Sequence, residues 1–193
     1  MIADVHLGYE WARAAGGDIV PAHSLAETLD RLERLLDRVS IRRLVVAGDL
    51  VERPTPCPRT WVDLHRLKEW LGEKGVELIA LRGNHDPPSK PPLPLSLAVD
   101  GWTIGHGHRP IRGARSISGH HHPILRASGV SAPCFLVGPS RIVLPAFSPN
   151  AAGLNVLGEV PAAWLEPDLR CIAGLGRTVL DFGPLAALRG RPA

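Results

Sequence analysis

The sequence RLVVAGD at residues 43–49 decides the fold. This run of β-branched and aliphatic residues, ended by glycine and aspartate, is typical of a buried strand that enters a polar loop. Residues 76–86, VELIALRGNHD, repeat the pattern. Each run therefore predicts a strand with unusual polar residues just past its carboxyl end.

Two helical patterns accompany these strands. Residues 24–39 carry apolar side chains three or four positions apart, and Ser24 with Glu27 has the spacing of a capping box. Residues 60–71 show a second apolar stripe, in which we expect Trp61 to face inward. Strands that alternate with helices predict an α/β fold, and such folds bind ligands beyond the carboxyl ends of their strands.

The second half of the chain has a different pattern, with short apolar runs separated by glycine, proline and serine. We interpret the runs as strands of a second sheet. They lie at residues 102–104, 115–118, 134–137, 141–144 and 154–157. The proline-rich stretch 87–94 is too short to separate two cores, so we predict a single domain that spans residues 1–193.

Composition excludes several classes of protein. The chain is 45% hydrophobic and 21% charged, as globular proteins are. No apolar run approaches the ~18 residues of a membrane span, and Asp4 and His6 come too early for a signal peptide, so we expect a cytoplasmic protein without a membrane partner. Three cysteines without CxxC spacing predict reduced thiols. A net charge of +3 is weak support for nucleic-acid binding.

Seven of the nine histidines lie in polar clusters. The clusters read DVH at 4–6, NHD at 84–86, HGH at 106–108 and GHHHP at 119–123, and GDLVE at 48–52 adds further carboxylates. This mixture of carboxylate, amide and imidazole groups suits manganese, iron, zinc or nickel and is too rich in nitrogen for calcium. If DVH and HHH lie on strands, their first and third residues project to the same side.

The order DxH, GDxxE, GNHD, HGH and GHxH over residues 4–122 resembles the five motifs of the calcineurin-like metallophosphoesterases. IADVHLGYE at 2–10, PCFL at 133–136 and LPAFS at 144–148 are similar to a narrower branch, the archaeal predicted phosphoesterases akin to Mre11 nuclease and the bacterial DNA-ligase-associated metallophosphoesterases. The resemblance implies a four-layer α/β/β/α sandwich with metals in loops at one end.

The resemblance also implies two divalent metal ions, with manganese first and iron, zinc or nickel as alternatives. Such a pair activates a water and holds a phosphoryl oxygen for in-line attack. The choice between the two histidines of HGH stays open, and the first is favoured because it directly follows a predicted strand. The implied ligands are two groups of three and one bridging carboxylate: Asp4, His6 and His122; Asn84, His106 and His120; and Asp49.

Five further residues have implied or candidate roles. The resemblance makes His85 the group that protonates the leaving oxygen or stabilises the transition state, with Asp86 orienting it. Arg82 and Arg109 are candidates for binding the substrate phosphate, and the alternative is that they are solvated surface residues. Glu52 stands where related proteins carry Asp, Asn or His; it either supports the site or is a surface residue.

The chain departs from the family at its start, because only three residues precede Asp4 where a full strand is expected. The first central strand is therefore truncated, and our hypothesis is a true start upstream of Met1. A missing strand would leave backbone groups unpaired and an open sheet edge, and the two expected outcomes are aggregation or pairing with a second copy as a homodimer.

The function that we expect is a two-metal phosphodiesterase or nuclease that hydrolyses phosphate esters, with a link to DNA repair that rests on the resemblance alone. A phosphatase or phosphodiesterase for small nucleotides is the alternative within the enzymes. A non-catalytic scaffold with the same fold is the third hypothesis. Such a scaffold is expected to lose metal ligands or the histidine of GNHD, and this chain retains both.

Overall fold

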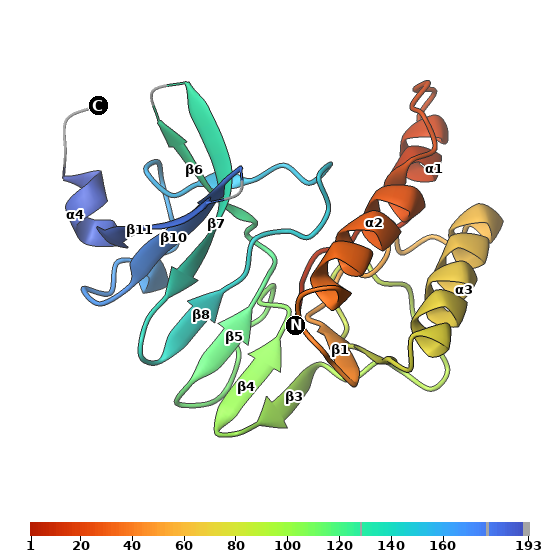
Figure 1. Ribbon diagram of the computed structural model, residues 1–193, viewed down its shortest axis with the longest axis horizontal. Coiled ribbons are helices and arrows are strands. Elements are labelled where there is room, and N and C mark those ends of the chain that lie inside the picture. Colours follow the sequence, from red (N-terminus) through yellow and green to blue (C-terminus); the bar gives the residue numbers. More distant parts are fainter. Residues whose placement is uncertain (128, 177, 191–193) are drawn as a thin grey trace.

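Two sheets face each other in the computed structural model, which describes residues 1–127, 129–176 and 178–190. Figure 1 shows the smaller sheet beside its helices and the larger sheet extending away from them. Among the described helices, none has both the length and the apolar character that crossing a membrane requires.

The smaller sheet contains the two runs that decide the fold. β1 (Arg43–Val46) and β2 (Glu77–Ala80) pair in parallel, as their sequences predict. Residues 2–4 extend this sheet, since Ile2 forms a parallel bridge with Val46. The short first segment thus lies beside β1 in this sheet. An upstream start stays a prediction.

Three helices belong to this half of the molecule: α1 (Tyr9–Ala14), α2 (Ser24–Leu36) and α3 (Pro58–Glu73). Both long helices were predicted, but the capping box at the start of α2 was wrong. The Ser24 hydroxyl instead accepts a hydrogen bond from the backbone N–H of Gly8, 3.2 Å away, and so ties α2 to the N-terminal segment. The inward placement of Trp61 was also wrong, since this side chain is 43% exposed.

The larger sheet has nine strands within the described residues, in the order β11-β10-β7-β8-β5-β4-β3, with β6 paired to β7 and β9 paired to β6. The five predicted runs correspond to β4, β5, β7, β8 and β9, and the sequence interpretation missed the other four. The strands are β3 (Ser96–Val99), β4 (Trp102–Gly105), β5 (Ser116–Ser118), β6 (Pro123–Ala127), β7 (Val130–Val137), β8 (Arg141–Val143), β9 (Leu154–Asn155), β10 (Arg170–Leu175) and β11 (Thr178–Pro184).

Alternation along β8 shows how the layers pack. Ile142 contacts the core between the two sheets, where Ile104 meets Ala47 of the smaller sheet. The next residue, Val143, points to the opposite face and joins a second core that includes Trp164. The short helices η1 (Ala162–Trp164) and α4 (Leu185–Arg189) cover that outer face. The predicted four-layer α/β/β/α fold is confirmed, with a reduced outer layer.

The parallel strands place their carboxyl ends at one end of the sandwich. β4, β5 and β8 run parallel to one another, as β1 and β2 do in the smaller sheet. The polar motifs follow β1, β2, β4 and β5 directly in the sequence. Both sheets therefore contribute loops to the same region, as α/β folds do at a ligand site.

Candidate metal centre

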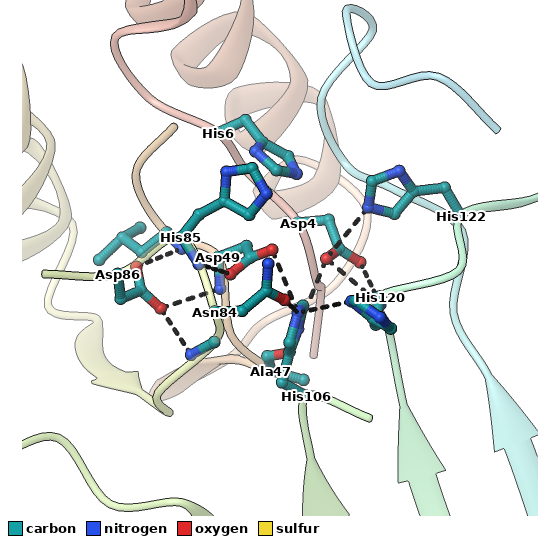
Figure 2. Close-up of polar contacts among 12 residues, drawn as sticks. Asp4, His6, Ala47, Asp49, Asn84, His85, Asp86, His106, His120 and His122 are labelled. Carbon is teal, nitrogen blue, oxygen red and sulfur yellow. Dashed lines mark hydrogen bonds and ion pairs between the residues drawn. The ribbon is translucent and has the colours of Figure 1, made fainter. Parts of the chain in front are cut away.

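Side chains from both sheets converge on one point in Figure 2. Three overlapping groups of residues have potential ligand atoms within 4.8 Å of one another. The groups are Asp4, His6 and His122; His6, Asp49 and His85; and Asp49, His106 and His120. Asp49 links the second and third groups, and His6 links the first and second. These shared members join the three groups into one continuous cluster.

One end of the cluster is built around His106, which is 2% exposed. Its Nε2 lies 3.0 Å from Oδ1 of Asn84 and 3.1 Å from Oδ2 of Asp49. Nδ1 of His120 lies 3.2 Å from the same nitrogen. His108 lies outside this set and lines a neighbouring cavity. Of the two histidines in HGH, the structure thus brings His106 into the cluster.

The other end is built around Asp4, which is fully buried. Nε2 of His122 lies 3.2 Å from Oδ1 of Asp4, and the backbone N–H of His120 donates to the same carboxylate at 3.0 Å. The buried Nε2 atoms of His6 and His122 have no aligned hydrogen-bond partner among the described residues. Buried nitrogens of this kind cost free energy unless they bind something. With adjacent carboxylates, they form a donor set that fits a borderline divalent metal.

The ligand side chains reach this point through an uncommon backbone conformation. We expected the DxH and HxH ligands to alternate along strands, but this was wrong. The first and third residues of both motifs, together with Asp49, have left-handed φ angles between 46° and 73°. Such angles cost non-glycine residues about 1–3 kcal/mol each and concentrate at functional sites. The residues are Asp4, His6, Asp49, His120 and His122.

Backbone carbonyl groups orient three of the imidazole rings. Nδ1 of His106 lies 3.1 Å from the Ala47 oxygen, and Nδ1 of His122 lies 2.8 Å from the Ala152 oxygen. Nδ1 of His85 lies 2.6 Å from the carbonyl oxygen of Glu52. A carbonyl can only accept a hydrogen bond, so each contact places the ring proton on Nδ1. The Nε2 lone pair of each neutral ring is then free to bind a metal or accept a proton.

Asp86 has a different role from the one expected. Its two oxygens accept hydrogen bonds from the backbone N–H groups of Asp49, Leu50, Val51 and Gly83, at 2.8–3.2 Å. The expected contact with the His85 ring is replaced by the Glu52 carbonyl. Asp86 therefore holds the loops after β1 and β2 together. The sequence did not predict that the backbone carbonyl of Glu52 would orient the His85 ring.

Two glycines allow these loops to approach the acidic side chains. A Cβ atom on Gly83 would collide with the carboxylate and backbone nitrogen of Asp49. A Cβ atom on Gly119 would collide with the carboxylate of Asp4 and lie 2.5 Å from Cβ of Ala3. The glycines of GNHD and GHxH are thus required by close packing against the two carboxylates.

Burial and neighbouring charges shift the pKa values of several members of the cluster. Burial by itself raises the pKa of Asp49, but the hydrogen bond and charge of His106 outweigh it, and the pKa is lowered. Burial by itself lowers the pKa of His106 and of His122, yet Asp49 and Asp4 respectively outweigh it and raise both. Burial and then the charge of His106 lower the pKa of His120 to about 4, so that this imidazole is neutral at pH 7.

Two cavities flank the cluster. One of about 380 Å³ is lined by His106 and His108 and by Arg109 and Arg112. The other, of about 280 Å³, is lined by His122 and includes Arg31 and Arg126. Neither lining contains a carboxylate. Arg109 thus lines a cavity beside the cluster, whereas the exposed Arg82 is outside both linings. The predicted contact of each arginine with substrate phosphate stays a prediction.

Comparison with known proteins identifies the class. A family model described as calcineurin-like phosphoesterase matches residues 1–102, which is more than half of the chain. The chain therefore belongs to the calcineurin-like phosphoesterase family. Its members use divalent metals, and the family shows that the chain is a hydrolase acting on phosphate esters.

Two particular proteins are similar to this chain. The DNA double-strand break repair protein Mre11 of Methanopyrus kandleri is 35% identical over 86 residues, which cover 44% of this chain and 18% of that protein. The match thus spans about a fifth of that relative. The crystal structure of the Pseudomonas putida nuclease MPE is 25% identical with a TM-score of 0.65, over 89% of this chain and 82% of that one. The predicted relationship to Mre11-like metallophosphoesterases is confirmed.

Proposed function

We propose that this protein is a two-metal phosphodiesterase whose substrate is a nucleic-acid backbone. The observation that carries the proposal is the set of three overlapping ligand groups that share Asp49 and His6. In this assignment Asp4, His6 and His122 hold one cation, and a second group of three holds the other. That second group is Asn84, His106 and His120, with Asp49 between the two groups.

Two divalent cations bound there would supply an activated water and neutralise charge on the phosphoryl group. Manganese is our first choice, because the donor set mixes hard oxygen with borderline nitrogen. The chain's own contribution is to fix the donors. Asp86 holds the loops that carry Asp49 and Asn84, and the carbonyl groups of Ala47 and Ala152 hold the rings of His106 and His122.

His85 is assigned to the leaving group. Its ring is half-buried beside the cluster, edge-on to His6 at 5.1 Å between ring centroids. The Glu52 carbonyl fixes the proton on Nδ1, so Nε2 is the atom that carries a second proton in the imidazolium form. Donation of that proton to the departing oxygen is general acid catalysis, which contributes about 10²–10⁴-fold to a rate.

The two flanking cavities favour a diester within a longer chain over a small monoester. Each cavity provides two arginines, and arginine forms forked contacts with phosphate. In the larger sheet, the first cavity lies by β3 and β4, the second by β6 and β7, and the His120 loop follows β5 between them. A nucleic-acid strand that crosses the cluster can therefore place neighbouring phosphates in both cavities. The names of both relatives, a nuclease and a DNA repair protein, support this substrate.

Hydrolysis of two model esters tests the proposal. Metal-free protein titrated with Mn²⁺ is expected to cleave bis-p-nitrophenyl phosphate faster than p-nitrophenyl phosphate. His85→Ala is expected to bind manganese normally and lose about 10²–10⁴-fold in turnover of the diester. A matched control is His65→Ala, because His65 lies on α3 with an exposed ring paired to Glu69.

The outcomes discriminate between the hypotheses. Faster turnover of the monoester would favour a small-nucleotide phosphatase. No turnover of either ester with two manganese ions bound would favour the scaffold hypothesis. Diester cleavage that survives His85→Ala unchanged would contradict the role given to this histidine.

A further inference from the structure

Two histidines of the cluster, His6 and His120, are oriented by groups other than a backbone carbonyl, and Nδ1 of His120 lies 3.2 Å from Nε2 of His106. Nδ1 of His106, His122 and His85 faces a backbone carbonyl, whereas Nδ1 of His6 faces a charged side chain. Oε2 of Glu52 lies 2.8 Å from this nitrogen. The distance is that of a hydrogen bond, although the contact is not aligned as one. Glu52 is therefore the nearest acidic partner of a buried imidazole that is 5% exposed.

The position of the Glu52 side chain is fixed by its backbone. The N–H of Glu52 donates to the carbonyl of Leu7 at 2.9 Å, next to His6 in the chain. The N–H of His6 in turn donates to the carbonyl of Asp49 at 3.0 Å. The four residues 49–52 are thus paired with residues 6 and 7, and the Glu52 side chain is only 22% exposed. A carboxylate in this place cannot be a free surface group.

We propose that Glu52 is a positioning residue that fixes the His6 ring through Nδ1 and directs Nε2 toward a cation. This role rests on the proposed function, because His6 is a ligand only if the centre binds metal. A ligating imidazole gains basicity when its other nitrogen donates to a carboxylate, and loss of such a partner typically costs about 10–100-fold in metal affinity.

The proposal makes the effect specific to one cation. Glu52 approaches His6, which shares one ligand group with Asp4 and His122 and another with Asp49 and His85. His106 and His120 belong to the third group, at the other end of the cluster. Removing the Glu52 carboxylate should therefore weaken one class of bound ion. The backbone carbonyl that faces His85 is unchanged by any side-chain substitution at this position.

The test measures metal binding and needs no turnover. Free Mn²⁺ is followed by electron paramagnetic resonance while metal-free protein is titrated, and the isotherm resolves two classes of site. Glu52→Ala is expected to weaken one class about 10–100-fold, the same class that His6→Ala weakens. Glu52→Gln keeps an oxygen acceptor without its charge, and its loss should be smaller. Glu166→Gln is the matched control, since Glu166 pairs with Arg141 at 3.1 Å in the other half of the molecule.

A double-mutant cycle decides whether Glu52 acts through His6. In the His6→Ala background, Glu52→Ala should add less than about twofold, because the ring that it holds is gone. Additive losses would overturn the proposal, as would equal weakening of both classes or unchanged binding in Glu52→Ala. Because binding and turnover are read separately, two bound manganese ions without hydrolysis would refute the proposed function while leaving the role of Glu52 to be decided by the cycle.

Discussion

The two ends of the ligand cluster differ in charge and in backbone conformation. At the Asp4 end, all three ligand candidates have left-handed φ angles, and the buried carboxylate of Asp4 is supplemented by Glu52 behind His6. At the other end, Asn84 supplies a neutral oxygen, and only His120 has a left-handed φ. Apart from the shared Asp49, whose φ angle is also left-handed, one end is therefore strained and acidic, and the other is relaxed and largely neutral.

In the proposed two-metal centre, this difference makes the two sites that share Asp49 unequal. Carboxylates attract a divalent cation more strongly than an amide does, so we expect the Asp4 end to bind its ion more tightly. Strain at that end is offset by hydrogen bonds to Gly48, Asp49 and Asp4 itself.

Removing the charge at the strong end should break the asymmetry. Asp4→Asn is expected to weaken the tighter manganese class by more than about a hundredfold, beyond the usual range for residues that only support a ligand. Asn84→Ala should weaken the other class and by a smaller factor. Manganese titration followed by paramagnetic resonance measures both. A larger loss in Asn84→Ala than in Asp4→Asn would reverse the assignment of the stronger end.

Alanine substitutions at Gly119 and Gly83 should distinguish the two ends of the cluster by their effects on manganese binding. Gly119→Ala forces a Cβ against the Asp4 carboxylate, and Gly83→Ala forces one against Asp49. Each is expected to destabilise the metal-free protein by about 1–3 kcal/mol. Gly119→Ala should weaken one manganese class, and Gly83→Ala both, because Asp49 is shared.

The matched control for crowding is Gly72→Ala near the end of α3. A Cβ there meets no atom within 4 Å, so this variant should be stabilised by about 0.5–1 kcal/mol through helix propensity. Urea denaturation of the three variants measures the differences. Equal stability of Gly72→Ala and Gly119→Ala would show that the loop can move aside.

The smallest effect is the pH dependence of the metal-free protein. The pKa of His120 is lowered to about 4. Its contribution to the free energy of unfolding is therefore present above pH 6.5 and is lost as the pH falls toward 4. The raised pKa values of His106 and His122 act in the opposite sense, because their contributions are present below pH 6.5 and are lost as the pH rises through the raised values. Stability from these groups should therefore peak near pH 6.5.

We expect His120→Ala to flatten the acid side of this profile by about 1 kcal/mol, a figure reduced for partial exposure. Urea denaturation between pH 4 and 8 in the presence of a chelator measures it. An unchanged acid limb in His120→Ala would assign the loss of stability to other groups.

The sequence predicted what depends on local pattern. The runs before Gly48 and Gly83 became β1 and β2, and α2 and α3 followed their apolar periodicity. The family motifs identified a set of residues that the structure brings together around Asp49. Such agreement arises because these features need only a few neighbouring residues to specify them.

What the sequence could not supply depends on distant partners. Ser24 had the spacing of a cap, but the backbone of Gly8 competes for its hydroxyl. Asp86 was assigned to its neighbour His85, yet four N–H groups from two loops occupy its oxygens. β10 and β11 were missed because their apolar residues form a core only after β10 has paired with β7 and β11 with β10.

The ligands come from two sheets that otherwise meet mainly through side chains. Asp49 and Asn84 follow strands of the smaller sheet, and His106, His120 and His122 follow strands of the larger one. Cations shared between them would act as crosslinks across the sandwich. Because a ligand that binds only the native state stabilises it by mass action, metal loading should raise the free energy of unfolding of the sandwich. Catalytic competence and resistance to proteolysis would then be gained together, in the same binding event.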